Sequence, residues 1–266
     1  MNWLRLRRWI GDHPVEDVFF EDPNGNSIHG WYMENSTTGS ADDPWLNILY
    51  LHGGGYNLAV NYRLERYSFL LSLGRVRLFA FEYAGYGKSE GQAKEDQILR
   101  SAEGALHWFE EKLNVSDARN ITLLGRSLGT SVASWLPAEV DSAEEVRRMV
   151  LFAGFAEVAS GAADMFPLVG WAVKEAFPDQ FQSTKYLPKY GKPWLDSGSP
   201  SCLLQVHSRD DDWVSMRQAR TLFRSATGVP DSCKTFVEFS GSLHTDFMWP
   251  AEKESTRTWL NEHREQ

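Results

Sequence analysis

The chain has little of what several protein classes require. Only 2 of its 266 residues are cysteine, Cys202 and Cys233, so a fold held together by several disulfide bonds is excluded. Such low cysteine use favours a reducing setting, and we expect a cytoplasmic protein. No apolar run is long enough for a membrane-spanning helix or for the core of a signal peptide. Internal repeats and low-complexity tracts are also missing, which argues against solenoids and extended linkers.

Positive charge is scarce as well. Lysine and arginine number 27 against 36 aspartate and glutamate residues, for a formal net charge of −9 at pH 7. A field of that sign repels phosphate backbones, so no nucleic-acid partner is expected. The remaining composition, 42% hydrophobic and 24% charged, provides enough apolar material for a core. We therefore expect residues 1–266 to form a single globular domain.

The first ten residues, MNWLRLRRWI, mix tryptophan, leucine and isoleucine with arginine. This pattern predicts a short amphipathic helix that docks its apolar face on the domain. The alternative is an interfacial anchor, in which the apolar side chains enter a lipid surface and the arginines meet anionic headgroups. Ten residues would bind such a membrane surface only weakly.

After a β-hairpin over residues 15–33, short apolar runs alternate with segments of helical spacing. The expected strands are 47–51, 77–82, 120–124, 148–153, 201–207 and 234–239, and the expected helices are 62–73, 96–113, 125–136, 216–226 and 251–264. Such β–α repeats predict an α/β fold with a mainly parallel central sheet and helices on both faces.

One connection is too long for this alternation. Residues 155–200 separate two expected strands and are rich in aromatic side chains, including Phe166 and Trp171. An ordinary connection needs far fewer residues, so we expect a helical cap, inserted over a binding site, with Phe166 and Trp171 in the wall of an acyl pocket. The alternative is that these aromatics only pack the segment onto the sheet.

The strongest chemical signal is the G-x-S-x-G pattern at Gly125-Arg-Ser127-Leu-Gly129. It follows strand 120–124 and precedes a helix, which is the strand–turn–helix setting that the motif requires. The turn would be so sharp that bulky neighbours of Ser127 would clash, which explains the flanking glycines. A glycine-rich helix start without catalysis is the alternative. We predict that Ser127 is a nucleophile.

A serine nucleophile needs a base, because its hydroxyl reacts poorly near neutral pH. His244 follows the last strand, so it returns to the same sheet edge as Ser127 and is the predicted base. The acid that orients the imidazole should come from another strand end. The acidic loop 210–212 offers such a group, and Glu157 is a more distant candidate. The remaining histidines considered are expected at the surface: His13, His29, His107 and His263.

The loop after the first parallel strand reads Leu51-His-Gly-Gly-Gly55. Its glycines would let the backbone approach a substrate and direct N–H groups at developing negative charge. We predict an oxyanion hole built from Gly54, or as second choice Gly55, together with Leu128, the residue after the nucleophile. A phosphate-binding loop is the rival interpretation, yet no Gly-Lys-Ser/Thr follows.

With these motifs the chain resembles the α/β-hydrolase superfamily from about Val15 onwards. The stretch Tyr83-Ala-Gly-Tyr-Gly-Lys-Ser-Glu-Gly91 is similar to the D-x-R-G-x-G-x-S-x-G segment of the ABHD12-type monoacylglycerol and lysophospholipid lipases. It also resembles the ABHD13, Bem46 and ABHD17 groups, the last of which are acyl-protein thioesterases. In these families the acid lies in H-G-x-x-D-x-x-V. The resemblance therefore places it on Asp211, with Val214 in register and Asp212 as second choice.

Three motifs depart from the family pattern. Ser208 replaces the glycine of the acid motif, Glu82-Tyr83-Ala84 replaces Asp-x-Arg, and His-Gly-Gly-Gly replaces the usual His-Gly-Asn. The candidate triad is unaffected, whereas the subfamily stays open. Epoxide hydrolases and haloalkane dehalogenases of this fold use an aspartate nucleophile, so Ser127 argues against both.

The sequence thus predicts a serine hydrolase without metal or cofactor. Its expected substrate is a small lipophilic carboxylic ester, such as a monoacylglycerol or lysophospholipid, cleaved through an acyl-enzyme. An acyl-protein thioesterase, a biosynthetic acyltransferase or cyclase, and a ligand receptor with little turnover are the alternatives. Acyl-chain length and oligomeric state stay open.

Overall fold

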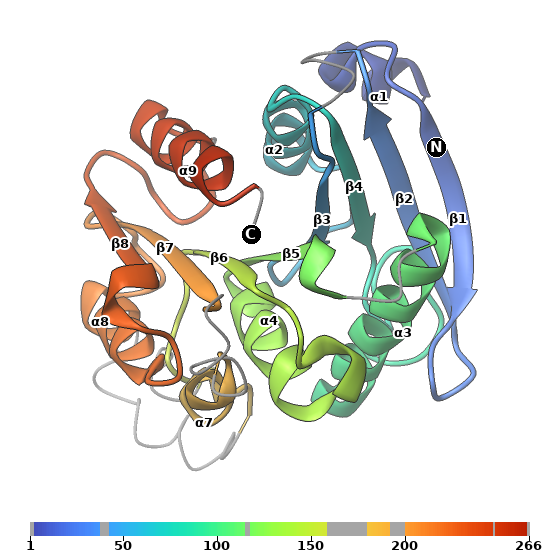
Figure 1. Cartoon of the computed structure of the whole chain (residues 1–266). Coiled ribbons are helices and arrows are strands. Elements are labelled where there is room, and N and C mark those ends of the chain that lie inside the picture. Colours follow the sequence, from blue (N-terminus) through green and yellow to red (C-terminus); the bar gives the residue numbers. More distant parts are fainter. Residues whose placement is uncertain are drawn as a thin grey trace.

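The computed structural model describes residues 3–37, 43–114, 118–158, 180–191, 200–246 and 248–264. Within them, eight strands form one sheet in the order β1-β2-β4-β3-β5-β6-β7-β8 (Figure 1). The pairs β1–β2 and β2–β4 are antiparallel, and all further neighbours from β4 to β8 are parallel. The predicted fold class, a mainly parallel sheet with an antiparallel N-terminal hairpin, is confirmed.

The strands and helices for which bounds are expected lie within three residues of them, and Ser183–Tyr186, a helix inside the expected cap segment, has no expected bounds. The strands are β1 (Val15–Glu21), β2 (Ser27–Asn35), β3 (Leu46–Leu51), β4 (Val76–Phe81), β5 (Ile121–Arg126), β6 (Arg148–Phe152), β7 (Cys202–Ser208) and β8 (Lys234–Phe239). The helices are α1 (Trp3–Ile10), α2 (Asn61–Leu71), α3 (Glu95–Leu113), α4 (Leu128–Glu139), α7 (Ser183–Tyr186), α8 (Met216–Ser225) and α9 (Pro250–Glu262).

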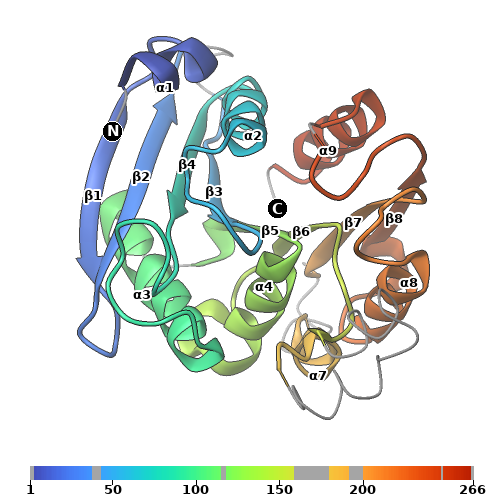
Figure 2. The same ribbon diagram turned by 180° about the vertical axis from the view of Figure 1, so that it is seen from behind.

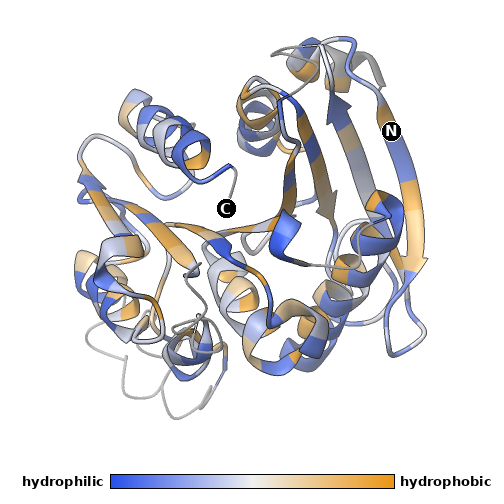
Figure 3. Cartoon of the chain, in the orientation of Figure 1, coloured by the Kyte–Doolittle hydropathy of each residue, from blue (hydrophilic) through white to orange (hydrophobic). Residues whose placement is uncertain are grey.

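Helices cover both faces of the sheet, α1, α2 and α9 on one and α3, α4 and α8 on the other (Figures 1 and 2). Strands β3, β5, β6 and β7 are buried at every position. Such double burial explains why these strands are nearly continuous apolar runs in the sequence. Hydrophobic residues accordingly line the central strands and the inner sides of the helices (Figure 3).

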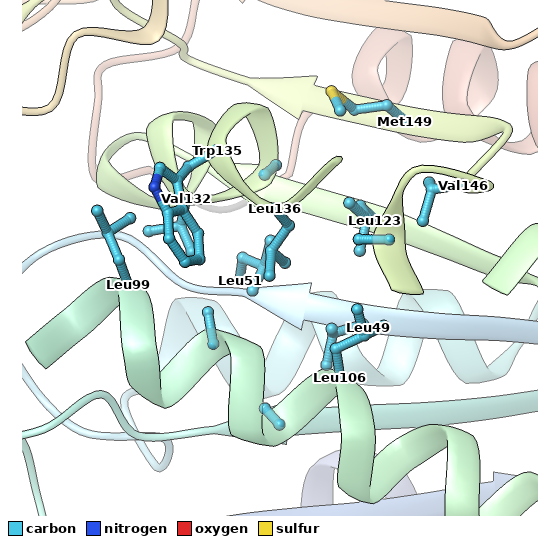
Figure 4. Close-up of a cluster of buried hydrophobic side chains, with 14 of the residues drawn as sticks. Leu49, Leu51, Leu99, Leu106, Leu123, Val132, Trp135, Leu136, Val146 and Met149 are labelled. Atoms are coloured by element: carbon cyan, nitrogen blue, oxygen red, sulfur yellow. The ribbon is translucent and has the colours of Figure 1, made fainter. Parts of the chain in front are cut away.

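Two separate apolar clusters lie on the two faces of the sheet. Because successive strand residues point to opposite faces, Leu49 and Leu51 of β3 join one cluster while Ile48 and Tyr50 join the other. In the first cluster, Leu106 of α3 packs beside Leu49 (Figure 4). These clusters hold helices against both faces of the sheet.

The N-terminal helix α1 docks on the domain, as the first alternative for residues 1–10 predicted. Leu6 and Ile10, one helical turn apart, are buried in the same cluster as α2. Among the described residues, no helix combines the length and the apolar character needed to cross a bilayer. Contact of residues 1–10 with a lipid surface stays a prediction.

The expected cap falls mostly on residues 159–179 and 192–199, which lie outside the described residues, as do Phe166 and Trp171. The described part of this segment contacts the domain. Phe181, Leu187 and Tyr190 are buried in the cluster on the α3 and α4 face. This part therefore packs on the domain, and the acyl-pocket role of Phe166 and Trp171 stays a prediction.

The expectation that His29 lies at the surface is wrong. Its side chain is buried on β2, between Asp17 of β1 and Glu82 after β4. Nε2 lies 2.5 Å from Asp17 Oδ1, and Nδ1 lies 2.9 Å from Glu82 Oε2. Two carboxylates, one on β1 and one directly after β4, thus satisfy both ring nitrogens, which allows this polar ring to be buried.

We expect Gly104→Ala to destabilise the protein, although alanine normally favours a helix by about 1 kcal/mol over glycine. Gly104 lies where α3 meets the hairpin, and a Cβ there would lie 2.9 Å from Asp22 Cα and 3.0 Å from the Glu21 carbonyl oxygen. The free energy of unfolding in urea should fall by about 1–3 kcal/mol. The control Glu111→Ala, on the exposed side of the same helix, should change it by less than about 0.5 kcal/mol. A gain in stability for Gly104→Ala would contradict this packing.

Candidate active site

Ser127 stands at the sharp turn between β5 and α4. Its backbone has φ 50° and ψ −117°, a conformation that residues with a side chain rarely adopt. Its N–H donates to the Phe152 carbonyl oxygen at 2.9 Å, and its own carbonyl oxygen accepts the Thr130 N–H at 2.9 Å. These bonds to β6 and α4 hold the strained residue at the carboxyl end of the sheet.

The steric reason for the two flanking glycines is visible in the structure. A Cβ on Gly125 would overlap the Gly129 carbonyl oxygen, and a Cβ on Gly129 would overlap the Leu51 carbonyl oxygen at the end of β3. Any side chain at either position would force β5, α4 and β3 apart. The glycines therefore allow three elements to meet at Ser127.

The structure brings the three predicted side chains together. His244 Nε2 lies 2.9 Å from Ser127 Oγ, and His244 Nδ1 lies 2.8 Å from Asp211 Oδ2. The side chains of His244 and Asp211 are only 3% and 2% exposed. The three residues follow the carboxyl ends of β5, β7 and β8. A hydroxyl, an imidazole and a carboxylate thus stand in hydrogen-bonded series.

Within the acidic loop, the aspartates have different partners. Asp211 reaches the imidazole and also accepts the Val214 N–H at 2.7 Å, which fixes its carboxylate. Asp212 Oδ1 instead accepts the backbone N–H of His244 at 2.9 Å, and Asp210 accepts another backbone N–H of that loop. The bond to the imidazole therefore comes from Asp211, and its two neighbours fasten the loop that carries His244.

The environment of Asp211 keeps it ionised. Burial by itself raises the pKa of the Asp211 carboxyl. The hydrogen bond and charge of His244, the Val214 N–H and the charge of His207 outweigh burial, so this pKa lies below its ordinary value. A charged carboxylate near neutral pH can hold the Nδ1 proton of His244 and leave Nε2 free to accept one.

The predicted amide donors lie beside the hydroxyl. A Cβ on Gly53 would lie 3.2 Å from Ser127 Cβ, so the glycine loop passes directly next to the nucleophile. Leu128 is the first residue of α4, where helix N–H groups have no intrahelical acceptor. Within the described ranges, neither the Gly54 nor the Leu128 N–H donates to a protein acceptor. Both are available to a bound group.

A pocket of about 510 Å³ opens over Ser127, within the range of small-molecule sites. Gly54 and His244 also line it. Its wall is largely apolar and includes Leu128, Phe155, Val158 and Val214. Tyr56 and Trp213 line it too and are themselves exposed, so they lie toward its mouth.

Three side chains that contact these groups were not singled out from the sequence. Trp213 stacks on the His244 ring, with centroids 5.2 Å apart and planes 7° apart. Buried Arg126, inside the G-x-S-x-G pattern, donates to the His244 carbonyl oxygen. Arg63 of α2 binds carbonyl oxygens of the glycine loop. Trp213 and Arg126 stand inside recognised motifs, whereas nothing local in the sequence marks Arg63.

Chemically, the arrangement suits attack by the Ser127 hydroxyl on a polarised carbon. The imidazole can accept the hydroxyl proton, and the free amides can stabilise negative charge that develops on the attacked group. In the part of the chain that the structure describes, no three His, Cys, Asp or Glu side chains are placed to hold a metal ion.

Known proteins match this chain along most of its length. YfhR, an uncharacterised protein of Escherichia coli K12, is 26% identical over 212 residues, which cover 80% of this chain and 68% of YfhR. The α/β-hydrolase domain-containing protein WAV2 of Arabidopsis thaliana is 23% identical over 235 residues, covering 87% and 72%. The lysophosphatidylserine lipase ABHD12 of Danio rerio is 26% identical over 216 residues, but this chain spans only 52% of that lipase.

Solved structures share the architecture. The Pyrococcus furiosus esterase Pf2001 superposes with a TM-score of 0.70 at 18% identity, over 94% of this chain and 93% of the esterase. Est1E of Butyrivibrio proteoclasticus, solved with ferulic acid, gives a TM-score of 0.68 at 15% identity, over 94% and 100%. The profile of the α/β-hydrolase fold family matches residues 47–184, more than half of the chain. With the sheet order and the turn at Ser127, this match shows that the chain belongs to the α/β-hydrolase fold family.

Proposed function

We propose that this protein is a serine hydrolase that cleaves carboxylic esters of lipophilic substrates through an acyl-enzyme. The observation that carries the proposal is the hydrogen-bonded series Ser127–His244–Asp211 beside the free amides of Gly54 and Leu128. Membership of a hydrolase family supports the same reaction class. No cofactor enters the proposed reaction.

In the acylation step, Ser127 Oγ attacks the acyl carbon of the ester while His244 Nε2 accepts the hydroxyl proton. The carbonyl oxygen becomes an oxyanion, which the Gly54 and Leu128 N–H groups stabilise. When the tetrahedral intermediate collapses, His244 gives its proton to the leaving alcohol. Asp211 orients the ring and stabilises the imidazolium that exists between these two transfers.

Water completes the reaction by the same route. His244 Nε2 removes a proton from a water molecule, whose oxygen attacks the acyl carbon bound to Ser127. The second tetrahedral intermediate uses the same amides. Its collapse breaks the bond to Ser127 Oγ, which takes the proton back from His244, and releases the carboxylic acid.

The pocket supports a lipophilic acyl group. Leu128, Phe155, Val158 and Val214 give it an apolar wall, and 510 Å³ has room for an acyl chain of several carbons. A relative whose name describes a lysophosphatidylserine lipase fits this substrate class.

Substitution of the triad should abolish turnover of p-nitrophenyl esters. We expect Ser127→Ala and His244→Ala each to lower kcat by about 10⁴-fold or more, with little further loss in the double variant, because the residues act as a unit. Labelling by a fluorophosphonate should disappear in Ser127→Ala. A labelled protein with no turnover would instead favour a ligand receptor.

The two aspartates provide a matched pair for the acid. Asp211→Asn should lose most activity because it removes the carboxylate bonded to His244 Nδ1, whereas Asp212→Asn should lose much less. If Asp212→Asn were the inactive variant, the acid would be assigned to the wrong residue.

Chain-length preference tests the acyl pocket. We expect kcat/KM to rise from acetyl toward medium-chain p-nitrophenyl esters, by up to about fourfold per buried methylene. Val158→Phe should place a larger side chain in the pocket wall and move the preferred acyl length to shorter chains. A Val158→Phe variant with altered Tm and unchanged chain-length profile would contradict a role of this wall in binding acyl groups.

The lowered pKa of Asp211 also links this carboxylate to stability. A pKa depressed by folding contributes stability above the unfolded value, about 4, and this contribution is lost as the pH falls through the folded value. The excess free energy of unfolding of the wild type over Asp211→Asn should therefore be largest near pH 7 and shrink below pH ~4. Urea unfolding of the wild type and of Asp211→Asn, near pH 7 and below pH ~4, tests this. A difference in free energy of unfolding between the two proteins that does not change with pH would contradict it.

A further inference from the structure

One buried arginine binds the glycine loop after β3. Arg63 of α2 is completely buried. Its Nη2 donates to the carbonyl oxygens of Gly53 and Gly55, both at 2.7 Å, and its Nη1 donates to the Asn57 carbonyl oxygen at 2.8 Å. The planar fork of a guanidinium can reach several acceptors at once. Arg63 thus binds alternate carbonyl groups along residues 53–57.

These bonds determine which way the loop's amides point. In a trans peptide the carbonyl group and the following N–H point in opposite directions, and the described chain has no cis peptide bond. Because the Gly53 carbonyl points at Arg63, the Gly54 N–H points away from it. This peptide is the one beside the nucleophile, since Gly53 abuts Ser127 Cβ.

The same hydrogen bonds distinguish between the two predicted oxyanion donors, Gly54 and Gly55. The Gly55 N–H belongs to the peptide whose carbonyl oxygen is that of Gly54, and Arg63 does not bind this oxygen. The Gly53 carbonyl oxygen also accepts a hydrogen bond from His52 Nδ1 at 2.7 Å, so Arg63 and His52 hold it together. The orientation of the Gly54 N–H is therefore imposed by hydrogen bonds across its own peptide, and that of the Gly55 N–H is not.

The far end of the loop is held from two sides. The Asn57 carbonyl oxygen accepts from Arg63, and the next N–H, that of Leu58, donates to Glu82 Oε1 at 3.2 Å. Glu82 is itself buried and bonded to His29. A buried cation and a buried carboxylate therefore hold opposite edges of one peptide and restrict rotation of the loop.

We propose that Arg63 is a positioning residue: by binding the carbonyl oxygens of Gly53, Gly55 and Asn57, it aims the Gly54 N–H at the oxyanion. The inference rests on the proposed function, because an oxyanion forms only if Ser127 attacks a carbonyl. Three consecutive glycines have the greatest backbone freedom to lose, and Arg63 removes that freedom before the reaction. An amide already oriented stabilises charge without reorganising in the transition state.

Arg63→Lys tests the proposal, since lysine keeps the charge but lacks the planar fork. We expect kcat for a p-nitrophenyl ester to fall by about 10- to 100-fold, with KM changed by less than about threefold. Affinity for a trifluoromethyl ketone, which forms a hemiketal oxyanion on Ser127, should fall by a similar factor, since it depends on the same amide.

Arg148→Lys is the matched control. Arg148 is also buried and donates to three backbone carbonyl oxygens. It is the first residue of β6 and so lies at the amino ends of the parallel strands, whereas Ser127 lies at their carboxyl ends. Both variants should lower Tm. Only Arg63→Lys should lower kcat per active site, counted by fluorophosphonate titration of Ser127.

An Arg63→Lys variant with the kcat and ketone affinity of Arg148→Lys would overturn the proposal. If Arg63→Lys does not fold, Arg63→Gln, which removes the buried charge and keeps one donor group, is measured in the same way and judged by the same criterion. Wild-type protein that neither reacts with the fluorophosphonate nor turns over esters would refute the serine hydrolase itself. Labelled, active wild type with an unimpaired Arg63 variant would refute only the role of Arg63.

Discussion

Close packing at the turn between β5 and α4 is the constraint on which the site depends. Ser127 adopts a positive φ because Gly125 and Gly129 leave no side chain between the strand, the helix and the Leu51 carbonyl oxygen. The same close approach brings the end of β3, and with it the glycine loop, to the hydroxyl. Backbone packing therefore brings the hydroxyl and the glycine loop together, and hydrogen bonds then hold Ser127 and the loop in place.

The imidazole is placed in a different way, because its loop follows β8 at the edge of the sheet. An edge strand has a neighbour on one side only, so packing alone restrains such a loop weakly. Hydrogen bonds therefore add to the stacking of Trp213 on the ring. Asp212 accepts the His244 N–H, Arg126 donates to the His244 carbonyl oxygen, and Asp211 binds the ring. Three bonds to one residue fix the ring relative to Ser127.

The strand ends that carry Ser127 and His244 could be predicted from the sequence, because hydrophobic periodicity and the glycine pattern are local signals. The choice of Asp211 needed the family resemblance, since adjacent aspartates in one loop differ only in the direction that the backbone gives them. Arg63 could not be predicted. Its partners are backbone carbonyl groups, which every residue type has, so no sequence pattern marks them. A charged residue in a partly buried helix is also normally expected at the surface.

The buried arginines around the site connect stability with the proposed chemistry. Arg66 pairs with Glu252, whereas the hydrogen bonds of Arg63 and Arg126 go to backbone carbonyl groups. Burial, and after it the charge of Arg66, lowers the pKa of Arg126, which shows that its charged form is disfavoured by its surroundings. Such groups cost folding free energy. In the proposed mechanism the charges of these arginines also leave a positive electrostatic potential beside Ser127. A developing oxyanion would be stabilised by that potential, and the negative charge of the oxyanion would in turn stabilise the buried arginines.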